Sequence, residues 1–264
     1  MDPDLLTSRL PQIKQALLSA IEQEKIDLVY QGQNALPSQR LVGIEVLCRL
    51  PSGPWGEVLP DQFIPIAEQT GLIASIERLV FTQLARDLPL LLQRYPEIRV
   101  GVNLSIGHIT APDFSSFIHN WLDALPQTTI ERLDFEITET YFQRISQHVV
   151  DGLHALRARG VRVVMDDFGS GQSSLGRLHI LPFDVIKLDK QFVQQIDHPM
   201  VYAIVKAAVA FTQEFGIELI AEGVETAEQC QTLETLNCHL VQGFFFSDPQ
   251  PLAHWLSPQD ASTP

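Results

Sequence analysis

Short apolar runs rich in valine and isoleucine alternate with helical segments along the chain, and this alternation limits the folds open to it. Strands alternating with helices are typical of parallel βαβ units rather than of a β-sandwich. A length of 264 residues suits one α/β barrel, since about 200 to 250 residues often form one. We therefore predict a single (β/α)8-type barrel, an α/β fold. Its predicted strands are 27–31, 41–47, 99–104, 133–137, 161–166, 185–189, 217–221 and 239–242.

One junction departs from the pattern of helical crossovers. The stretch 32–40 is rich in turn-forming residues and is too short for the crossover helix that parallel neighbours need. We therefore predict that the first two strands are antiparallel.

Apolar residues at three- and four-residue steps predict a helix ahead of the first strand. The end of the chain is polar and rich in proline and serine, so we expect it to fray. The predicted organisation is a helical lead-in at 1–22, a barrel at 23–256 and a frayed tail at 257–264. The lead-in helix is predicted from Leu10, Ile13, Leu17 and Ile21.

Local signals also predict where two of the later helices begin. Thr226 with Gln229 resembles a capping box, in which two side chains satisfy the first backbone amides of a helix. Asp113 stands where the side-chain cap of the helix around Trp121 is expected.

Acidic residues outnumber basic ones by 32 to 18, which gives a formal net charge of −14 at pH 7. A surface this acidic repels duplex nucleic acid and anionic lipid, so neither is an expected partner. Any ligand that carries phosphate must therefore bind where the local charge of the protein is positive rather than negative.

The sequence carries no signal for export or membrane insertion. No apolar run approaches the roughly 18 residues of a membrane helix, and the start lacks the basic region of a signal peptide. Cys48, Cys230 and Cys238 form no CxxC pair, which suits reduced thiols. We expect a cytoplasmic protein.

Polar side chains stand at the carboxyl ends of the predicted strands, where a barrel has its catalytic mouth. Charges embedded in apolar runs are costly unless they are paired or bind a metal. Oxygen ligands without a His or Cys cluster favour Mg²⁺ or Mn²⁺ over Zn²⁺. In chain order these residues are Glu45, Asn103, Glu136, Asp166 with Asp167, Lys187 with Asp189, Glu222 and Gln242.

Any one of these residues could be a helix cap or a solvent contact, but so many strand ends together are poorly explained that way. Asp166 and Asp167 are the sharpest signal, because adjacent carboxylates repel and usually need a cation between them. One such carboxylate can bridge two metals about 3.5 to 4 Å apart, as in phosphoester hydrolysis. The residues alone also leave open a Mg²⁺-dependent barrel lyase of the enolase type.

The segment Glu-Val-Leu-Cys-Arg at 45–49 resembles the ExLxR signature of the EAL domain, the bacterial cyclic di-GMP phosphodiesterase. Further motifs follow in the order of that family, and the resemblance covers about residues 20 to 252. These motifs are Val-Asn-Leu-Ser (102–105), Glu-Ile-Thr-Glu (136–139), Asp-Asp-Phe-Gly-Ser-Gly (166–171), Lys-Leu-Asp (187–189), Glu-Gly-Val-Glu (222–225) and Gln-Gly (242–243).

The resemblance implies a modified TIM barrel whose first strand is antiparallel, which agrees with the short junction at 32–40. It implies metal-dependent hydrolysis of cyclic di-GMP to the linear dinucleotide pGpG, with two Mg²⁺ or Mn²⁺ ions and inhibition by Ca²⁺. It also implies a homodimer, and an upstream sensor domain if this chain is part of a longer protein.

Carried over position by position, the resemblance implies a role for each motif residue. Lys187 would contact the attacking water, and Glu222 would act as general base or as a metal ligand through water. Glu139, Glu225 and Asp189 would support the surrounding shell and the loop after Asp167. The implied metal ligands are Glu45, Asn103, Glu136, Asp166 and Asp167, and the implied substrate contacts are Gln31, Arg49 and Gln242. Two cations with Lys187 and Arg49 would supply the local positive charge.

Three positions depart from the family pattern. Val46 replaces the alanine of the signature, and Gly32 follows Gln31 where proline is frequent. Gln172 stands where tyrosine is frequent, in the loop 169–174 that the family uses to couple metal binding to dimerisation. We therefore expect a weaker anchor for this loop.

A catalytically silent barrel that binds cyclic di-GMP or a protein partner is the main alternative. Such relatives typically lack a metal ligand or the base, whereas every one of those positions is filled here. We therefore predict an active phosphodiesterase.

Overall fold

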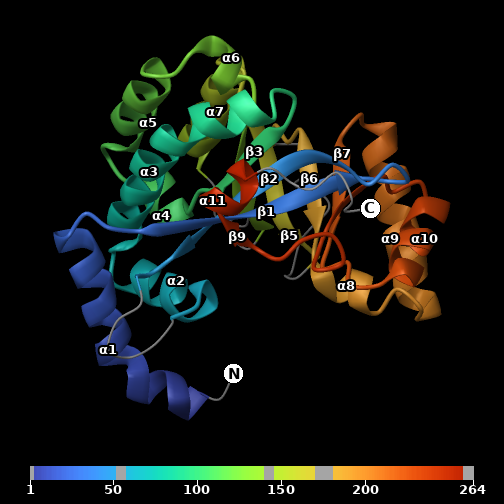
Figure 1. Cartoon of the computed structure of the whole chain (residues 1–264), viewed down its shortest axis with the longest axis horizontal. Coiled ribbons are helices and arrows are strands. Elements are labelled where there is room, and N and C mark those ends of the chain that lie inside the picture. Colours follow the sequence, from blue (N-terminus) through green and yellow to red (C-terminus); the bar gives the residue numbers. More distant parts are fainter. Residues whose placement is uncertain (1–2, 52–57, 140–145, 170–180, 258–264) are drawn as a thin grey trace.

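The computed structural model describes residues 3–51, 58–139, 146–169 and 181–257, in which helices lie between most of the successive strands from β2 onward (Figure 1). The strands are β1 (Asp27–Ala35), β2 (Arg40–Arg49), β3 (Arg99–Asn103), β4 (Leu133–Thr138), β5 (Arg162–Phe168), β6 (Val185–Leu188), β7 (Glu218–Glu222), β8 (Leu240–Gln242) and β9 (Gln250–Pro251). The helices are α1 (Pro3–Glu22), α2 (Pro60–Gln69), α3 (Ile73–Arg94), α4 (Ile106–Ile109), α5 (Phe114–Asp123), α6 (Gln127–Ile130), α7 (Gln147–Ala158), α8 (Lys190–Gln194), α9 (Pro199–Glu214), α10 (Ala227–Thr235) and α11 (Leu252–Leu256).

The strands β1 to β8 close into a barrel. Their order is β2-β3-β4-β5-β6-β7-β8-β1, and β1 also pairs with β2, while β9 adds to β1. β1 runs antiparallel to β2 and β8, whereas β2 to β8 run parallel to one another. The predicted barrel with an antiparallel first strand is confirmed. The carboxyl ends of β2 to β8 therefore share one rim, which we call the mouth.

The hairpin between β1 and β2 is tighter than the sequence predicts. Both strands extend into the turn-rich stretch, so that residues 36–39 alone lie between them. The cause is long-range pairing, because Gln33, Asn34 and Ala35 pair with β8 and remain extended.

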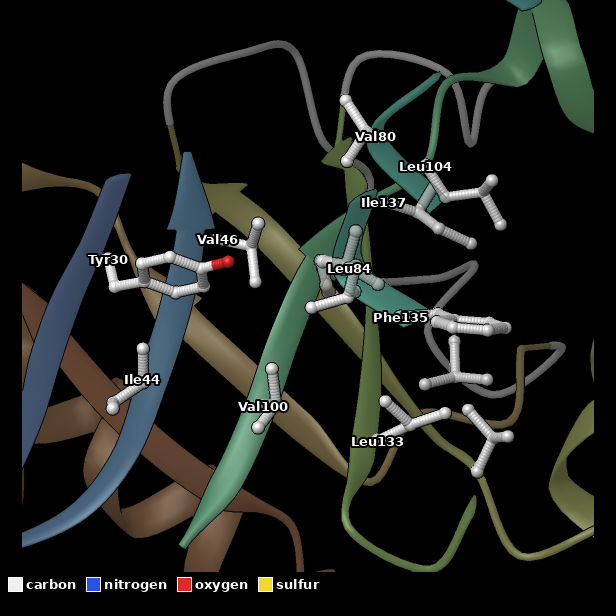
Figure 2. Close-up of a cluster of buried hydrophobic side chains, with 14 of the residues drawn as sticks. Tyr30, Ile44, Val46, Val80, Leu84, Val100, Leu104, Leu133, Phe135 and Ile137 are labelled. Atoms are coloured by element: carbon white, nitrogen blue, oxygen red, sulfur yellow. The ribbon is translucent and has the colours of Figure 1, made fainter. Parts of the chain in front are cut away.

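Strand residues alternate between an apolar outer face and an inner face that carries the polar side chains of the site, as the period of a strand requires. The inner face also carries a small apolar cluster of Val164, Val185 and Ile220. Ile44, Val46, Val100 and Phe135 are buried with Leu84 of α3 in one cluster between the barrel and its helices (Figure 2). Burying each such side chain stabilises the fold by about 1.5–3 kcal/mol. The residues between them on the strands face the interior of the barrel, where the polar side chains gather.

Gly101 makes room inside the barrel for a carboxylate. It lies on β3 opposite Glu45 of β2 in the strand register. A Cβ at Gly101 would lie 2.0 Å from Oε1 of Glu136, so a larger residue would have to displace that side chain. The glycine thus allows Glu45 and Glu136 to share the interior.

The amino ends of the strands form the opposite rim, which is held by ion pairs. Buried Asp134 at the start of β4 accepts hydrogen bonds from Arg99 and Arg162, each at 2.7 Å. Arg162 of β5 also pairs with Glu218 of β7. These contacts tie β3, β4, β5 and β7 together at the rim away from the mouth.

Helix α1 packs against α2 and α3 at one side of the barrel (Figure 1). Its buried contacts are made by Ile13, Leu17 and Ala20. Within the described residues, no helix combines the length and the apolar character that crossing a bilayer needs.

One of the two predicted helix caps is confirmed and the other is wrong. The Thr226 hydroxyl accepts from the Gln229 amide at 3.2 Å, and Gln229 Oε1 accepts from the Thr226 amide, so α10 begins with a capping box. Asp113 precedes α5, but its side chain caps no amide and instead accepts from Arg78 Nη2 at 2.7 Å. The charged donor on α3 outcompetes the local backbone amides.

Candidate active site

The mouth brings together side chains from seven parallel strands, because these strands end at the same rim. The register sets Asn103 of β3 opposite Glu136 of β4, and Glu222 of β7 opposite Gln242 of β8. Antiparallel β1 joins them, since its Gln31 lies opposite Glu45 of β2. The predicted strand-end residues therefore do converge in space.

Lys187 of β6 lies at the centre of this convergence and is 1% exposed. Its Nζ lies 2.7 Å from Glu222 Oε1, 2.8 Å from Glu136 Oε2, 2.9 Å from Glu45 Oε2 and 3.3 Å from Asp166 Oδ1. Burial disfavours the ammonium, but the four carboxylates outweigh burial and raise the pKa of Lys187 well above its usual value. Lys187 is therefore a fixed cation in the middle of the site.

Amide side chains hold Glu45 from two further directions. Asn103 Nδ2 donates to Glu45 Oε1 at 3.0 Å, and Gln242 Nε2 donates to Glu45 Oε2 at 2.6 Å. Burial opposes ionisation of Glu45, but Lys187 and these hydrogen bonds prevail and lower its pKa. Glu45 is therefore held as a carboxylate.

Gln33 extends this amide network, and the sequence patterns do not predict it. Its Nε2 donates to Gln242 Oε1 at 3.0 Å, while Gln242 Nε2 also donates to Gln31 Oε1 at 3.2 Å. The signal was present in the period of two, because Gln31 and Gln33 share the inner face of β1. It was missed because the predicted strand stops at residue 31.

Unlike Glu45, the carboxylates of Glu136, Glu222 and Asp167 have raised pKa values. Burial, then repulsion from Glu45 and Asp166, raises the pKa of Glu136 well above its usual value, although Lys187 acts in the opposite direction. Burial likewise raises the pKa of Glu222 to about 8, and burial with repulsion from Asp166 and Asp189 raises that of Asp167 to about 6. The site therefore has an excess of negative charge that one lysine does not balance.

Asp167 breaks the alternation of its strand. Its φ is +56°, and the pairing of β5 with β6 is irregular between Met165 and Phe168. Successive strand residues normally point to opposite faces, but ligand oxygens of Asp166, Asp167 and Glu222 all lie within 4.8 Å of one another. A strained left-handed residue costs on the order of 1 kcal/mol or more, and such strain is concentrated at functional sites.

These residues fit divalent cations. Among the described residues, buried Asp166 Oδ1 has no hydrogen-bond donor, and its near neighbour is the Lys187 ammonium at 3.3 Å. The oxygen-only ligand set and the excess of negative charge are both matched by a hard ion such as Mg²⁺ or Mn²⁺.

Two cavities open above the carboxylates. The larger has a volume of about 510 Å³ and extends toward α2 and α3, whereas the smaller, of about 330 Å³, lies toward β7, β8 and Gln31. Glu45, Asp166, Asp167 and Lys190 line both cavities. The carboxylates therefore lie where two separate binding spaces meet.

A buried hydrogen bond between Glu77 and His108 supports the segment that follows Asn103. Glu77 of α3 accepts from the Ser105 amide at 2.7 Å, and its other oxygen lies 2.8 Å from Nδ1 of fully buried His108. Burial raises the pKa of Glu77, although the hydrogen bonds from His108 and Ser105 oppose it. This pair fixes the chain just beyond a predicted metal ligand, and the sequence gives no signal for it.

The other predicted residues lie around the cluster. Gln31 and Glu225 line the smaller cavity. Arg49 ends β2, donates to the Cys48 carbonyl at 2.9 Å and lines neither cavity. Asp189 caps α8 by accepting from the Gln191 amide at 2.8 Å.

Glu139 lies at the end of β4 and is buried. It accepts a hydrogen bond from the backbone amide of Gly169, two residues after Asp167. The rest of the predicted loop 169–174, with Gln172, lies outside the described residues.

The fold and the site define a closed α/β barrel with a lysine-centred carboxylate cluster at its mouth. The sequence model of the EAL domain matches residues 14–249, and the chain belongs to this family. The resemblance seen in the motifs is confirmed, and the enolase-type alternative is dropped.

Relatives with 33 to 35% identity include the oxygen sensor protein DosP of Escherichia coli and the bifunctional diguanylate cyclase/cyclic di-GMP phosphodiesterase MucR of Pseudomonas aeruginosa. DosP is 35% identical over 92% of this chain and 31% of its own length, and MucR is 33% identical over 93% and 36%. The chain thus spans about a third of the length of these curated relatives.

Two solved structures share the fold. The MucR phosphodiesterase in complex with c-di-GMP matches with a TM-score of 0.84 and 33% identity, over 92% of this chain and 99% of that one. The EAL enzyme Bd1971, bound to cAMP and cyclic di-GMP, matches with a TM-score of 0.86 and 28% identity, over 94% and 69%.

Proposed function

We propose that this chain hydrolyses one phosphodiester bond of cyclic di-GMP to give linear pGpG, with the help of divalent cations. The observation that carries the proposal is the carboxylate cluster around Lys187 at the junction of two cavities. A cyclic dinucleotide has two nucleoside halves joined through phosphates, so each half can enter one cavity while a phosphate lies over the cluster. Relatives named as cyclic di-GMP phosphodiesterases support this assignment.

We propose Mg²⁺ or Mn²⁺ as the ions, with Ca²⁺ inhibitory because it prefers longer bonds and more ligands. Such ions supply Lewis acidity to the phosphate oxygens and to the attacking water. The ligands of one ion would be Glu45, Asn103, Glu136 and Asp166, and those of the other Asp166 and Asp167.

In this reaction each of the following side chains would have a separate role. Lys187 holds the attacking water by a hydrogen bond, and Glu222 accepts a proton from that water as its oxygen bonds to phosphorus. The bond from phosphorus to the 3′ oxygen breaks, and that oxygen takes up a proton as it leaves. A base with a pKa of about 8 is well matched to neutral pH. Gln31, Gln242 and Arg49 would bind the substrate, with Glu225 and Asp189 supporting the shell.

The test is incubation of the protein with cyclic di-GMP and Mg²⁺, followed by chromatography of the products. We expect pGpG in the presence of Mg²⁺ or Mn²⁺, and intact substrate in excess chelator or Ca²⁺. Recovery of intact nucleotide bound to the protein under all conditions would instead support the silent receptor.

We further propose that the active form is a homodimer and that the bond from Gly169 to Glu139 links dimerisation to the metal site. Asp167 lies two residues before Gly169, so a partner that orders the following segment would act on the ligand. Sedimentation of wild type and Glu139→Ala across a concentration series, with activity measured in parallel, tests this. A fully active monomer that is indifferent to the substitution would refute it.

The setting of the domain is also a proposal. We propose a cytoplasmic protein in which residues 1–22 lead into a barrel at 23–256 that ends in a tail at 257–264. The relatives extend well beyond the matched region, which is consistent with control by an upstream sensor domain.

A further inference from the structure

Lys190 is the only cationic residue among the described residues that line the two cavities. Six carboxylate residues line the larger cavity, and the smaller one adds Glu222 and Glu225. Lys187 lies beneath the cluster, where four carboxylates already surround it. Inside these two cavities a dianionic nucleotide therefore meets one uncommitted positive charge, since Arg49, the other proposed cationic contact, lines neither of them.

The position of Lys190 is fixed by the neighbouring strand end. Gly223, directly after Glu222, has a φ of +71°, and a Cβ there would lie 2.4 Å from Cβ of Lys190. The stem of Lys190 thus packs on the glycine backbone. Within the described part of the chain its ammonium forms no ion pair, and the residue is exposed.

Lys190 also lines both cavities, so it lies at their junction together with Asp166 and Asp167. At the start of α8 its charge gains nothing from the helix, because cations are favoured at the carboxyl end of a helix and not at the amino end. The fold therefore gives no reason for a positive charge at this position, whereas an anionic ligand in the cavities would give one.

We propose that Lys190 binds the second phosphate of the cyclic dinucleotide, the one that is not cleaved. This inference rests on the proposed function, because it takes its substrate from there. The phosphate that reacts is served by the cations, Lys187 and the carboxylate ligands, whereas the second phosphate has no other positive partner in the cavities. A contact that is the same in the ground state and in the transition state lowers KM and leaves kcat unchanged.

The experiment compares two substrates and four proteins. Cyclic di-GMP has two phosphodiesters, and bis(p-nitrophenyl) phosphate has one and so lacks the second phosphate. The proteins are wild type, Lys190→Met, which keeps the apolar stem, Lys190→Arg, which keeps the charge, and Lys206→Met as a control on the exposed face of α9.

We expect Lys190→Met to raise KM for cyclic di-GMP about tenfold, the usual effect of losing one charge-assisted hydrogen bond, with kcat within about twofold. Lys190→Arg should restore KM, and Lys206→Met should match wild type. Hydrolysis of the single-phosphate substrate should be the same in all four proteins. An unchanged KM in Lys190→Met, or an equal loss on both substrates, would overturn the inference.

Failure of the proposed function is distinguishable from failure of this inference. If wild type binds cyclic di-GMP without cleaving it, hydrolysis is refuted, and equilibrium titration of the four proteins decides the role of Lys190. About tenfold weaker binding by Lys190→Met alone supports the contact. Equal binding by all four proteins refutes it, and absence of binding by wild type refutes both proposals.

Discussion

The Nζ of Lys187 lies 2.7 Å from Oε1 of Glu222, and the same nitrogen contacts three further carboxylates. One cation thus serves four anions in a buried space, with Asp167 close by. Adding a divalent cation and removing one carboxylate relieve the same excess of negative charge, but only the first is compatible with the proposed catalysis.

Glu222→Gln should lower kcat about 10²- to 10⁴-fold, because the amide cannot accept the proton of the attacking water. Affinity for cyclic di-GMP should stay within a few-fold, since glutamine keeps the shape of the side chain. Steady-state kinetics and a binding titration measure the two effects. Glu214→Gln, at the exposed end of α9, is the matched control. Turnover near that of wild type would exclude Glu222 as the base.

Asp167→Asn should stabilise the metal-free protein and should remove the rise in Tm that Mg²⁺ gives the wild type. Burial and repulsion from Asp166 make the ionised form of Asp167 costly, and asparagine tolerates the left-handed backbone. A gain of about 1 kcal/mol corresponds to a rise of about 2–4 °C in Tm for a domain of this size.

Thermal denaturation in chelator and in Mg²⁺ measures both effects of Asp167→Asn. The control is Asp197→Asn, an exposed residue between α8 and α9. A Tm in chelator equal to that of wild type would contradict the excess of negative charge.

Stability of the metal-free protein should fall as the pH rises from about 4 to about 8. Folding raises the pKa of Asp167 to about 6 and that of Glu222 to about 8, so the native state binds more protons than the unfolded state in this window. Stability then decreases with pH. The lowered pKa of Glu45 acts below its usual value of 4.5, at the acid end of this window, where it opposes the trend.

Urea denaturation at pH 5 to 8.5 in chelator measures this slope. Glu222→Gln should flatten it between pH 6 and 8, and Mg²⁺ should flatten it in wild type. A stability that rises steadily through this window in chelator would contradict the raised pKa values.

Gly101→Ala should reduce activity strongly and destabilise the fold by about 1–3 kcal/mol, because its Cβ would overlap Glu136 inside the barrel. Gly152→Ala on α7 is the contrasting control, since a Cβ there meets nothing within 4 Å. In a helix that change should stabilise by about 0.5–1 kcal/mol. Equal melting temperatures for the two variants would show that the interior yields more readily than the geometry implies.

The strands and the antiparallel start could be predicted because their signals are local. Periods of two, short apolar runs and the length of the junction at 32–40 lie within a few residues of one another. The same holds for the capping box of Thr226 and Gln229, three residues apart. The predicted cap at Asp113 is wrong because the Asp113 side chain binds Arg78, which lies 35 residues away. No local pattern shows that Arg78 competes with the backbone amides for this carboxylate.

The residues of the site could be predicted more readily than the contacts between them. Carboxylates at strand ends indicate a mouth, but nothing in the sequence tells that Lys187 contacts four of them at once. Gln33 and the pair of Glu77 with His108 were missed because long-range pairing and burial make them important. Lys190 is an ordinary lysine in the sequence, and only the cavities around it give it a role.

The way the barrel closes also sets the order in which the site can form. Gln242 reaches Glu45 across 197 residues and Gln31 across 211, through the pairing of β1 with β8. Such distant contacts form late, because the loss of chain entropy precedes any gain from them. A nascent chain that has not yet emerged through β8 would hold the carboxylates and Asn103 but not Gln242, one of the two amides that hold Glu45. The proposed catalytic site would then be complete only after β8 has paired with β1.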